Sequence, residues 1–344
     1  MNQVFLNDKD VNQNLFPLTL TRSAADIRIG ILTIREKWNH LLRKPVGFIT
    51  GEQSSGQGES TSVSSSIVPS AAFVASSDHS LAKSIKYPWD IFLLNDWALR
   101  EDFSLITKGR SSEPIPASVG VINPAGVFIE PGSKLSHCII NAETGPVYIG
   151  KDAEIMEGAT LRGPIAICNN AVVKMGAKIY GATTIGPYSI VGGEIKNSVI
   201  FGYSNKSHDG YLGDSVIGEW CNLGAGTSNS NMKNNVSEVR VWNYLQKDVI
   251  GTGTKKCGLI MGDYSRSAIN TSFNTGTVVG VCANVFGEGL VSKFVPSFSW
   301  GKNGLRYEFN KAVDDVSKWM QLKGQSLNEE QKTRLKLIFD DTNF

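Results

Sequence analysis

The fold is decided by the stretch IGKDAEIMEGATLRGPIAICNNAVVKMGAKIYGATTIGPYSIV, which runs from residue 149 to residue 191. A period of six fits neither the 3.6 of a helix nor the two of a strand, but it suits a chain that turns a corner after every six residues. Three such sides close one triangular coil, so the stretch predicts the hexapeptide repeat of a parallel β-helix. An aliphatic residue occupies every sixth position without a break: Ile149, Ile155, Leu161, Ile167, Val173, Ile179, Ile185 and Val191.

The same pattern returns later in the chain, after two apparent interruptions. The first covers residues 197–214 and contains His208, and the second covers about 228–258. Loops that break a regular scaffold tend to carry function, so we expect functional residues in both. The segment VSEVRVWNYL, residues 236–245, alternates like a strand and is predicted to lie against a neighbouring subunit. The pattern resumes at Ile217 and Leu223, and again at Met261, Phe273, Val279, Val285 and Val291.

The regions on either side of the repeat are predicted to be helical in part. The segment DIRIGILTIREKWNHLL, residues 26–42, has helical apolar spacing, and EQSSGQGESTSVSSS, residues 52–66, has the composition of a flexible linker. After Gly301 one helix is predicted to end at Gly324, and Ser326 with Glu329 predicts a capping box for a last helix. These helices are expected to cover the open end of the solenoid. The expected domains are therefore 1–110, 115–300 and 301–344.

Composition narrows the class of protein. Among 344 residues, 34 basic and 32 acidic ones give a net charge of +2 with no basic block, which argues against nucleic-acid or membrane-surface binding. The five cysteines are widely spaced and form no CxxC pair, so buried reduced thiols are expected. The N-terminus lacks the pattern of a signal peptide, and no stretch is long enough to span a bilayer. A cytoplasmic protein with small-molecule partners or copies of itself is expected.

One polar stretch, SNKSHDGYLGDSVIGEWCNLGAGTSNSN at residues 204–231, carries the functional signal. His208 stands shortly before YLGD, and NLGAGT and Asn231 follow. This order and spacing resemble the acetyltransferase half of the bifunctional N-acetylglucosamine-1-phosphate uridyltransferase/glucosamine-1-phosphate acetyltransferase family. The resemblance implies a left-handed hexapeptide β-helix, a homotrimer with sites between neighbouring prisms, and acetyl-CoA as co-substrate.

The resemblance also implies roles for individual residues. His208 falls on the catalytic base, Tyr211 and Asn222 fall on contacts to the amino sugar, and Ala225 and Asn231 fall near the acetyl-CoA site.

Three further residues match positions that hold the sugar phosphate in that family. Glu194 and Lys196 match a Glu-x-Lys motif that lies twelve residues before the histidine. Lys178 falls where the family has an arginine, so it keeps the charge but lacks the bidentate fork of a guanidinium.

The residue types themselves suit acyl transfer from a thioester to an amine. The amine must lose a proton before it attacks, and an imidazole titrates near neutral pH, which predicts His208 as the general base. Backbone N–H groups in the glycine-rich NLGAGT segment are suited to stabilise the oxyanion. No covalent enzyme intermediate is needed.

The chain as a whole also resembles a bacterial branch of sugar-nucleotidyltransferase-like proteins, with its departures in the N-terminal part. FPLTLTRSAADIRIGILTIREKW at residues 16–38 and YPWDIFLLN at residues 87–95 carry this resemblance, but the usual LAAGxGTR loop is missing. Arg22, Arg28 and Lys37 are candidate remnants of a phosphate site. The expected fold is thus mainly β, a left-handed parallel β-helix with a truncated α/β nucleotidyltransferase-like N-terminal domain and C-terminal helices.

Three functions stay open at this stage. The leading one is an acetyl-CoA-dependent acyltransferase acting on a glucosamine-1-phosphate-like amino sugar phosphate. The alternatives are a sugar-1-phosphate nucleotidyltransferase, which alone would require Mg²⁺, and a non-catalytic trimeric subunit. A metal hydratase of the same fold needs three histidines around zinc, but only His137 and His208 lie in or beside the β-helix, so no metal site is predicted.

Overall fold

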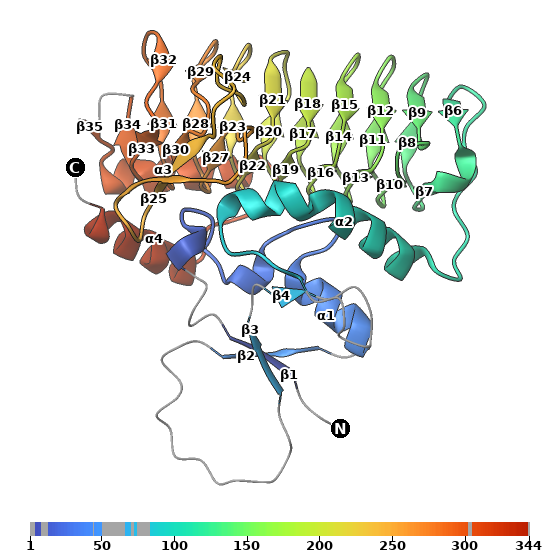
Figure 1. Ribbon diagram of the computed structural model, residues 1–344, viewed down its shortest axis with the longest axis horizontal. Coiled ribbons are helices and arrows are strands. Elements are labelled where there is room, and N and C mark those ends of the chain that lie inside the picture. The colour runs from blue at the N-terminus through green and yellow to red at the C-terminus, as the bar shows by residue number, and fades with distance from the viewer. Residues whose placement is uncertain are drawn as a thin grey trace, which may run out of the picture.

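A long parallel β-helix dominates the molecule, with helix α2 (Pro88–Thr107) along one side and the N-terminal segments beneath it (Figure 1). The computed structural model describes residues 4–7, 13–43, 45–49, 66–69, 72–73, 83–301 and 305–342. The predicted linker at 52–66 therefore lies outside the described residues, apart from Ser66.

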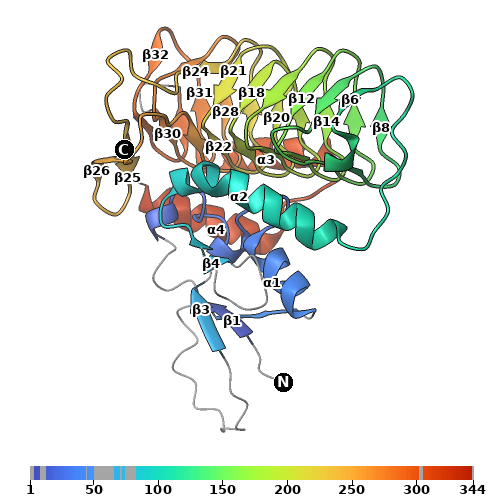
Figure 2. The same ribbon diagram turned by 45° about the vertical axis from the view of Figure 1, so that its right-hand side comes forward.

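Each coil of the β-helix contributes one short strand to each of three faces, and strands on one face pair in parallel along the axis (Figure 2). The first face contains β7 (Val127–Ile129), β10 (Val147–Ile149), β13 (Ile165–Ile167), β16 (Thr183–Ile185), β19 (Val199–Ile200), β22 (Val216–Ile217), β27 (Ile260–Met261), β30 (Val278–Val279) and β33 (Phe294–Val295). The second face contains β8 (Lys134–Leu135), β11 (Glu154–Ile155), β14 (Val172–Val173), β17 (Ile190–Val191), β20 (Asn205–Lys206), β23 (Asn222–Leu223), β28 (Arg266–Ser267), β31 (Asn284–Val285) and β34 (Ser299–Trp300), followed by the antiparallel β35 (Leu305–Arg306). The third face contains β6 (Gly120–Ile122), β9 (Ile139–Asn141), β12 (Thr160–Arg162), β15 (Lys178–Tyr180), β18 (Glu194–Lys196) and β21 (Tyr211–Gly213), and then β24 (Ser228–Asn229), β29 (Ser272–Phe273) and β32 (Leu290–Val291).

The aliphatic column that predicted the fold forms the interior of the prism. All eight of its residues between 149 and 191 are at most 2% exposed, so the predicted parallel β-helix is confirmed. The five cysteines are buried free thiols, also as expected. One corner of each coil holds a residue with positive φ, and the stacked rings of Tyr188, Tyr203 and Trp220 follow that corner with centroids 4.8 and 4.2 Å apart.

The predicted interruption at 197–214 is wrong, because the solenoid continues through it as β19, β20 and β21. What changes is the length of the coil. Ile167 pairs with Ile185 eighteen residues on, whereas Ile185 pairs with Ile200 only fifteen residues on. Shorter corners shift the six-residue count without breaking the sheets. The repeat therefore looks interrupted in the sequence although the coils continue in the structure.

The second interruption is real and leaves the solenoid as a hairpin of β25 (Arg240–Asn243) and β26 (Asp248–Gly251). Its inward residues Val239 and Val241 are fully buried in one cluster with apolar residues of the N-terminal segment. Trp242 stacks on Phe294 of the solenoid with ring centroids 4.6 Å apart. The segment predicted to lie against a neighbouring subunit thus packs on its own chain.

The N-terminal part forms small elements, of which the turns and α1 pack against the first face. A three-stranded parallel sheet contains β1 (Val4–Asn7), β2 (Gly47–Ile49) and β3 (Ser66–Pro69), and β4 (Ala72–Phe73) pairs with β5 (Lys83–Ser84). Short 3-10 turns, η1 (Gln13–Leu15) and η2 (Ala24–Asp26), precede helix α1 (Ile34–Leu42), and a third, η3 (Pro124–Gly126), lies between β6 and β7 in the first coil.

Only the second half of the segment predicted to be helical, residues 26–42, forms a helix. Thr33 caps α1 in a capping box with Glu36, so the helix begins at Ile34. Before it, Ile27, Ile29 and Ile31 are buried with period two rather than 3.6, and Gly30 turns the chain at a φ of 74°. An added Cβ on Gly30 would lie 2.8 Å from the backbone of α2, so this turn accommodates only glycine.

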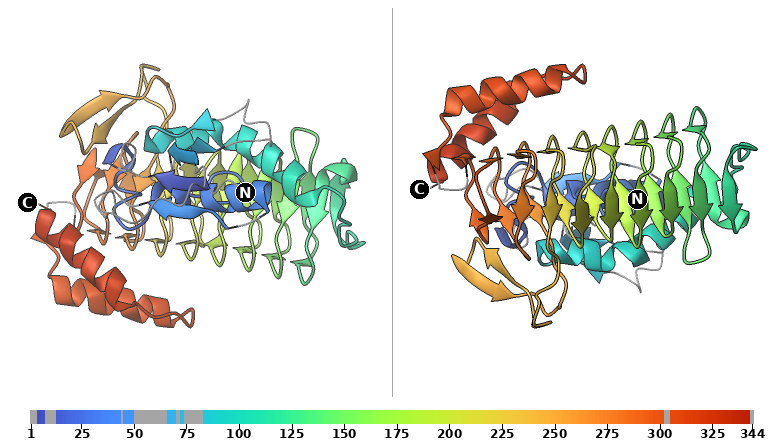
Figure 3. Two further views of the ribbon diagram at one scale, coloured as in Figure 1. Left: turned by 90° about the horizontal axis from the view of Figure 1, so that it is seen from below. Right: turned by 90° about the horizontal axis from the view of Figure 1, so that it is seen from above.

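The C-terminal helices α3 (Phe309–Gln321) and α4 (Glu329–Asp341) run along a flank of the β-helix, opposite the β25–β26 hairpin (Figure 3). Ala312, Val316 and Met320 pack in one cluster with corner residues such as Trp220 and Tyr264 and with Phe298 near the end of the solenoid. The cap of α4 is different from the prediction, because Asn328 with Gln331 forms the capping box in place of Ser326 with Glu329.

Candidate functional site

Two outward-facing columns on the third face bring most of the predicted sugar-phosphate residues together. In one column Lys178, Glu194 and Tyr211 are direct neighbours on successive strands. In the other, Tyr180 lies next to Lys196. The Tyr180 hydroxyl donates to Glu194 Oε1 at 2.6 Å, and the Lys196 ammonium lies 5.7 Å from the centre of the Tyr180 ring. The third face therefore presents a connected row of cations, phenols and a carboxylate.

His208 occupies the corner between the second and third faces, three residues before Tyr211, and its side chain is exposed. The corners of the coils on either side are built from glycine. A Cβ added to Gly193 would lie 2.8 Å from the His208 carbonyl oxygen, and Gly226 donates its N–H to the Asp209 carbonyl at 3.0 Å. Ala225 belongs to that next corner, so the predicted acetyl-CoA position adjoins the predicted base.

Asn222 is separated from the rest of the set, because it lies on the second face. There it pairs with Asn205 and Arg266, whereas Tyr211 belongs to the third face. The His208 corner separates Asn222 from Tyr211. The residues predicted to bind the sugar and acetyl-CoA therefore lie on both sides of one edge of the prism rather than on one surface.

A polar network fixes Tyr211. The Asn231 amide donates to the Tyr211 hydroxyl at 3.0 Å and also to Asp214, which accepts a second hydrogen bond from Asn197 at 2.7 Å. Burial and the neighbouring Asp214 carboxylate raise the pKa of Tyr211 to about 12. Its phenol therefore stays protonated at neutral pH and is a neutral hydrogen-bond donor.

Sequence reasoning missed Arg162 and Tyr180, which extend the site along the third face. Arg162 lies next to Tyr180 in register, and both line an open groove of about 420 Å³ together with Lys178. The hydrogen bond to Glu194 and burial raise the pKa of Tyr180 to about 12. Counting eighteen residues on from Arg162 would have placed it next to Tyr180, whereas the following step in that column, from Tyr180 to Lys196, is only sixteen residues. The groove thus contains a guanidinium one coil before Lys178.

The three N-terminal cations that suggested a phosphate site are paired with carboxylates. Arg22 bonds Asp263, Arg28 lies 3.4 Å from Glu36, and Lys37 bonds Asp102. These cations are 12%, 12% and 2% exposed, so each is largely shielded from a ligand in solution. Their interpretation as remnants of a phosphate site is therefore replaced by a structural one, in which Arg22 and Lys37 fasten the N-terminal segment to the β-helix and to α2, and Arg28 pairs within that segment.

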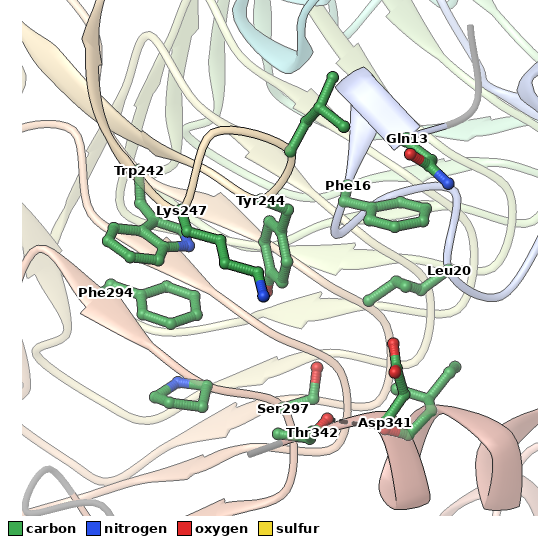
Figure 4. A pocket seen from close by; sticks show the side chains of 13 residues that line it. Gln13, Phe16, Leu20, Trp242, Tyr244, Lys247, Phe294, Ser297, Asp341 and Thr342 are labelled. Carbon is green, nitrogen blue, oxygen red and sulfur yellow. Dashed lines mark hydrogen bonds between the residues drawn. The ribbon is translucent and has the colours of Figure 1, made fainter. Parts of the chain in front are cut away.

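A larger cavity of about 520 Å³ lies elsewhere, between the β25–β26 hairpin, the N-terminal turn and the end of α4 (Figure 4). Its lining includes four aromatic residues, Phe16, Trp242, Tyr244 and Phe294, together with aliphatic and polar side chains. None of the residues predicted from the acetyltransferase motif lines it.

The described residues contain no group of three or more His, Cys, Asp or Glu side chains placed to hold a metal ion. No helix in that part of the chain has the length and apolar character to cross a membrane.

Comparison with known proteins shows similarity to sugar-phosphate enzymes over part of the chain. Residues 4–76 match the family model described as "Sugar nucleotidyl transferase". The bifunctional sugar-1-phosphate nucleotidylyltransferase/acetyltransferase of Sulfurisphaera tokodaii is 30% identical over 153 residues, which cover 44% of this chain and 38% of that protein. The bifunctional protein GlmU of Synechococcus elongatus is 22% identical over 229 residues, covering 60% and 46% respectively.

A shorter and more similar match is the GlmU of Methanocaldococcus jannaschii, 39% identical over 87 residues, or 25% of this chain and 21% of that protein. Among solved structures, the UDP-N-acetylglucosamine acyltransferase of Francisella novicida covers 67% of this chain and 90% of its own, at 14% identity and a TM-score of 0.34. The chain spans less than half the length of each of the curated relatives named here. Over part of its length the chain is thus similar to bifunctional sugar-phosphate nucleotidyltransferase/acetyltransferases.

Proposed function

We propose that the protein is an acetyl-CoA-dependent acyltransferase that acetylates an amino sugar phosphate of the glucosamine-1-phosphate type. The observation that carries this proposal is the third-face row of Lys178, Glu194 and Tyr211, in register beside the exposed His208 corner. Such a row offers charge and hydrogen bonds to a phosphorylated sugar next to an imidazole that accepts a proton from its amine. The similarity to bifunctional nucleotidyltransferase/acetyltransferases supports the same assignment.

In this proposal each group has a separate task. His208 takes the proton from the amine as its nitrogen adds to the thioester carbonyl of acetyl-CoA. The tetrahedral intermediate then collapses with cleavage of the C–S bond, and the departing CoA thiolate takes up a proton. Lys178, Lys196 and Arg162 attract the phosphate, with Glu194 and Tyr211 as hydrogen-bonding groups for the sugar. Ala225 and Asn231 border the acetyl-CoA, and Asn222 reaches the sugar from the second face. A trimer would supply a neighbouring prism opposite this edge.

The test is a turnover screen with acetyl-CoA against amino sugars and their 1-phosphates, followed by release of the free CoA thiol. We expect turnover with an amino sugar 1-phosphate and a much higher KM for the sugar without phosphate. Absence of turnover with every amino sugar, in a folded preparation, would contradict the proposal. Light scattering on the same preparation measures whether the particle has the mass of three chains.

Arg162 provides a prediction about phosphate binding. Replacing it with alanine removes the guanidinium from the groove that also contains Lys178. We expect KM for the sugar phosphate to rise about tenfold, because a charge-assisted hydrogen bond contributes about 1.5–3 kcal/mol, with little change in kcat. Arg100→Ala is the matched control, since its guanidinium is also exposed but pairs with Asp96 on α2. An equal KM in the Arg162→Ala variant and the wild type would remove Arg162 from the site.

A second candidate activity, sugar-1-phosphate nucleotidyl transfer, is favoured by one observation, the family match over residues 4–76. It would require Mg²⁺ and release pyrophosphate from a nucleoside triphosphate. The carboxylate pairing of Arg22, Arg28 and Lys37 argues against a phosphate site at those cations. Pyrophosphate release from a panel of nucleoside triphosphates with sugar 1-phosphates and Mg²⁺ tests it directly.

A further inference from the structure

A lysine occupies the interior of the prism at a position where the coils before and after place aliphatic side chains. On the second face Lys206 pairs with Val191, and its strand pairs with β23, whose inward residue is Leu223. Lys206 is 2% exposed, so its ammonium is removed from water almost completely. Burying an ammonium is costly unless the group is hydrogen-bonded, and an aliphatic residue at this position would avoid that cost.

The ammonium of Lys206 is bound by two backbone carbonyls of the corner region. It donates to the His208 carbonyl within its own coil and to the Gly192 carbonyl of the preceding coil at 3.3 Å. These two corners are in close contact, because a Cβ added to Gly192 would lie 2.5 Å from the Ser207 carbonyl oxygen. Lys206 thus joins consecutive corners from inside, and one of its bonds is to the backbone of His208 itself.

A second polar residue of the interior holds the other end of the same segment. Asn229 is 5% exposed, accepts the Gly213 N–H at 2.9 Å and donates to the Gly213 carbonyl at 3.1 Å. In the next coil its position is occupied by Phe273, which is 1% exposed. The segment from His208 to Gly213, with Tyr211 inside it, is therefore held from within the prism at both ends.

We propose that Lys206 is a positioning residue, which fixes the His208 corner by binding its backbone carbonyl from inside the prism. This inference rests on the proposed role of His208 as general base. The imidazole is exposed and is carried on a three-residue corner, so the orientation of its ring depends on how firmly that backbone is held. A displacement of about 1 Å in a catalytic group lowers a rate by up to about 100-fold.

The arrangement predicts opposite effects of one substitution on stability and on activity. Lys206→Met keeps a long side chain of similar volume but removes the buried charge, so the folded protein is expected to unfold at the same or a higher temperature. The same change releases the His208 carbonyl. We expect kcat for acetyl transfer to fall about 10- to 100-fold with KM nearly unchanged, because the groove on the third face is untouched.

The pH dependence of kcat gives an independent readout. Burial lowers the pKa of Lys206 to about 8, and the nearby Asp209 carboxylate opposes that shift. Below about pH 8 the ammonium is charged and binds the carbonyls strongly, and above it the neutral amine binds them more weakly. The wild type is therefore expected to lose kcat as the pH rises through about 8, and the Lys206→Met variant is expected to lack that decline.

Lys323 is the matched control, because it is a second lysine of the same region. Its ammonium contacts the Tyr188 and Tyr203 carbonyls and Asn205 from outside the coil, and burial lowers its pKa to about 8 as well. It makes no contact with His208 in the described residues. Lys323→Met is expected to leave both kcat and its decline above pH 8 as in the wild type.

The experiment compares the wild type with Lys206→Met, Lys323→Met and His208→Ala in melting temperature, kcat, KM and pH profile. Hydrogen exchange of residues 208–210 at one fixed pH measures the corner without reference to activity, and Lys206→Met is expected to lose protection there while Lys323→Met keeps it. Normal protection and normal kcat in folded Lys206→Met would overturn the positioning role. So would failure of Lys206→Met to fold, since the proposal expects undiminished stability. Full activity of His208→Ala would instead overturn the proposed function. Hydrogen exchange of residues 208–210 would then still test whether Lys206 holds the backbone of the corner.

Discussion

Replacement of His208 by alanine is expected to lower kcat for acetyl transfer by about 10²- to 10⁴-fold, the contribution typical of a general base. The amine of an amino sugar is mostly protonated at neutral pH and attacks a thioester only after it has lost a proton. His208 is the imidazole at the corner beside the Lys178, Glu194 and Tyr211 row, so its removal leaves that proton to water. KM for the sugar phosphate is expected to change little, because the cations of the groove remain.

His137 offers a matched control for this measurement. It is an exposed histidine at another corner of the same β-helix, and its Nδ1 lies 3.0 Å from the Ser136 hydroxyl. His137→Ala is expected to keep wild-type kcat and KM. Release of CoA thiol under saturating acetyl-CoA measures both variants, and a His208→Ala protein with wild-type kcat would exclude the general-base role.

Replacement of Asp102 by alanine is expected to lower the free energy of unfolding by about 3–5 kcal/mol, the cost of breaking a buried ion pair from one side. Asp102 of α2 accepts hydrogen bonds from the Ile31 and Leu32 backbone N–H groups at 2.8 and 3.0 Å and from the Lys37 ammonium. Both charged side chains are at most 3% exposed. The substitution therefore removes one acceptor that three buried or partly buried donors share.

Asp314→Ala is the control for this second prediction. Asp314 pairs with Lys318 on the outer side of α3, where both side chains are more than half exposed, and exposed pairs contribute about 0–1 kcal/mol. Denaturant unfolding followed by circular dichroism measures both variants. If Asp102→Ala is as stable as Asp314→Ala, the Lys37–Asp102 pair does not hold the N-terminal segment on α2.

The sequence predicts the architecture well because one geometrical rule repeats. An aliphatic residue at each sixth position has only one way to be buried when the chain turns at regular corners, so the column from Ile149 to Val191 defines the prism. The His208 motif was recognisable for a similar reason, since its residues keep fixed offsets along the chain. Neither inference required knowledge of contacts between distant residues.

The positions of individual residues on the faces of the prism depend on corner lengths and on long-range contacts, which the sequence does not show. Shortened coils between Ile185 and Leu212 move each later residue onto a face that a count of six does not predict, so Asn222 and Tyr211 could not be assigned to different faces. The inward position of Lys206 was hidden for the same reason. A lysine in a polar stretch is normally exposed, and only the register of β20 with β17 places it inside.

The start of the N-terminal helix was predicted wrongly because its apolar residues fit both a helical period of 3.6 and a strand period of two. A helical period fits all four isoleucines approximately, and a strand period fits the first three of them; the four are Ile27, Ile29, Ile31 and Ile34. The Thr33–Glu36 capping box sets the start of the helix at Ile34. The partners of Arg22 and Lys37 lie 241 and 65 residues away along the chain, so no local pattern indicated that they were structural rather than phosphate-binding.

The pairing of Arg22 with Asp263 has a consequence for the order of folding during synthesis. The segment that contains Arg22 leaves the ribosome before the β-helix, and its carboxylate partner follows 241 residues later, after most coils of the β-helix have been made. Coils contact mainly their immediate neighbours and are able to stack one at a time, whereas this contact closes a very long loop. We therefore expect the segment that contains Arg22 to dock on the β-helix late in folding. Until it docks, its apolar residues Leu15, Leu18, Ile27 and Ile29 stay exposed and form a surface that chaperones can bind.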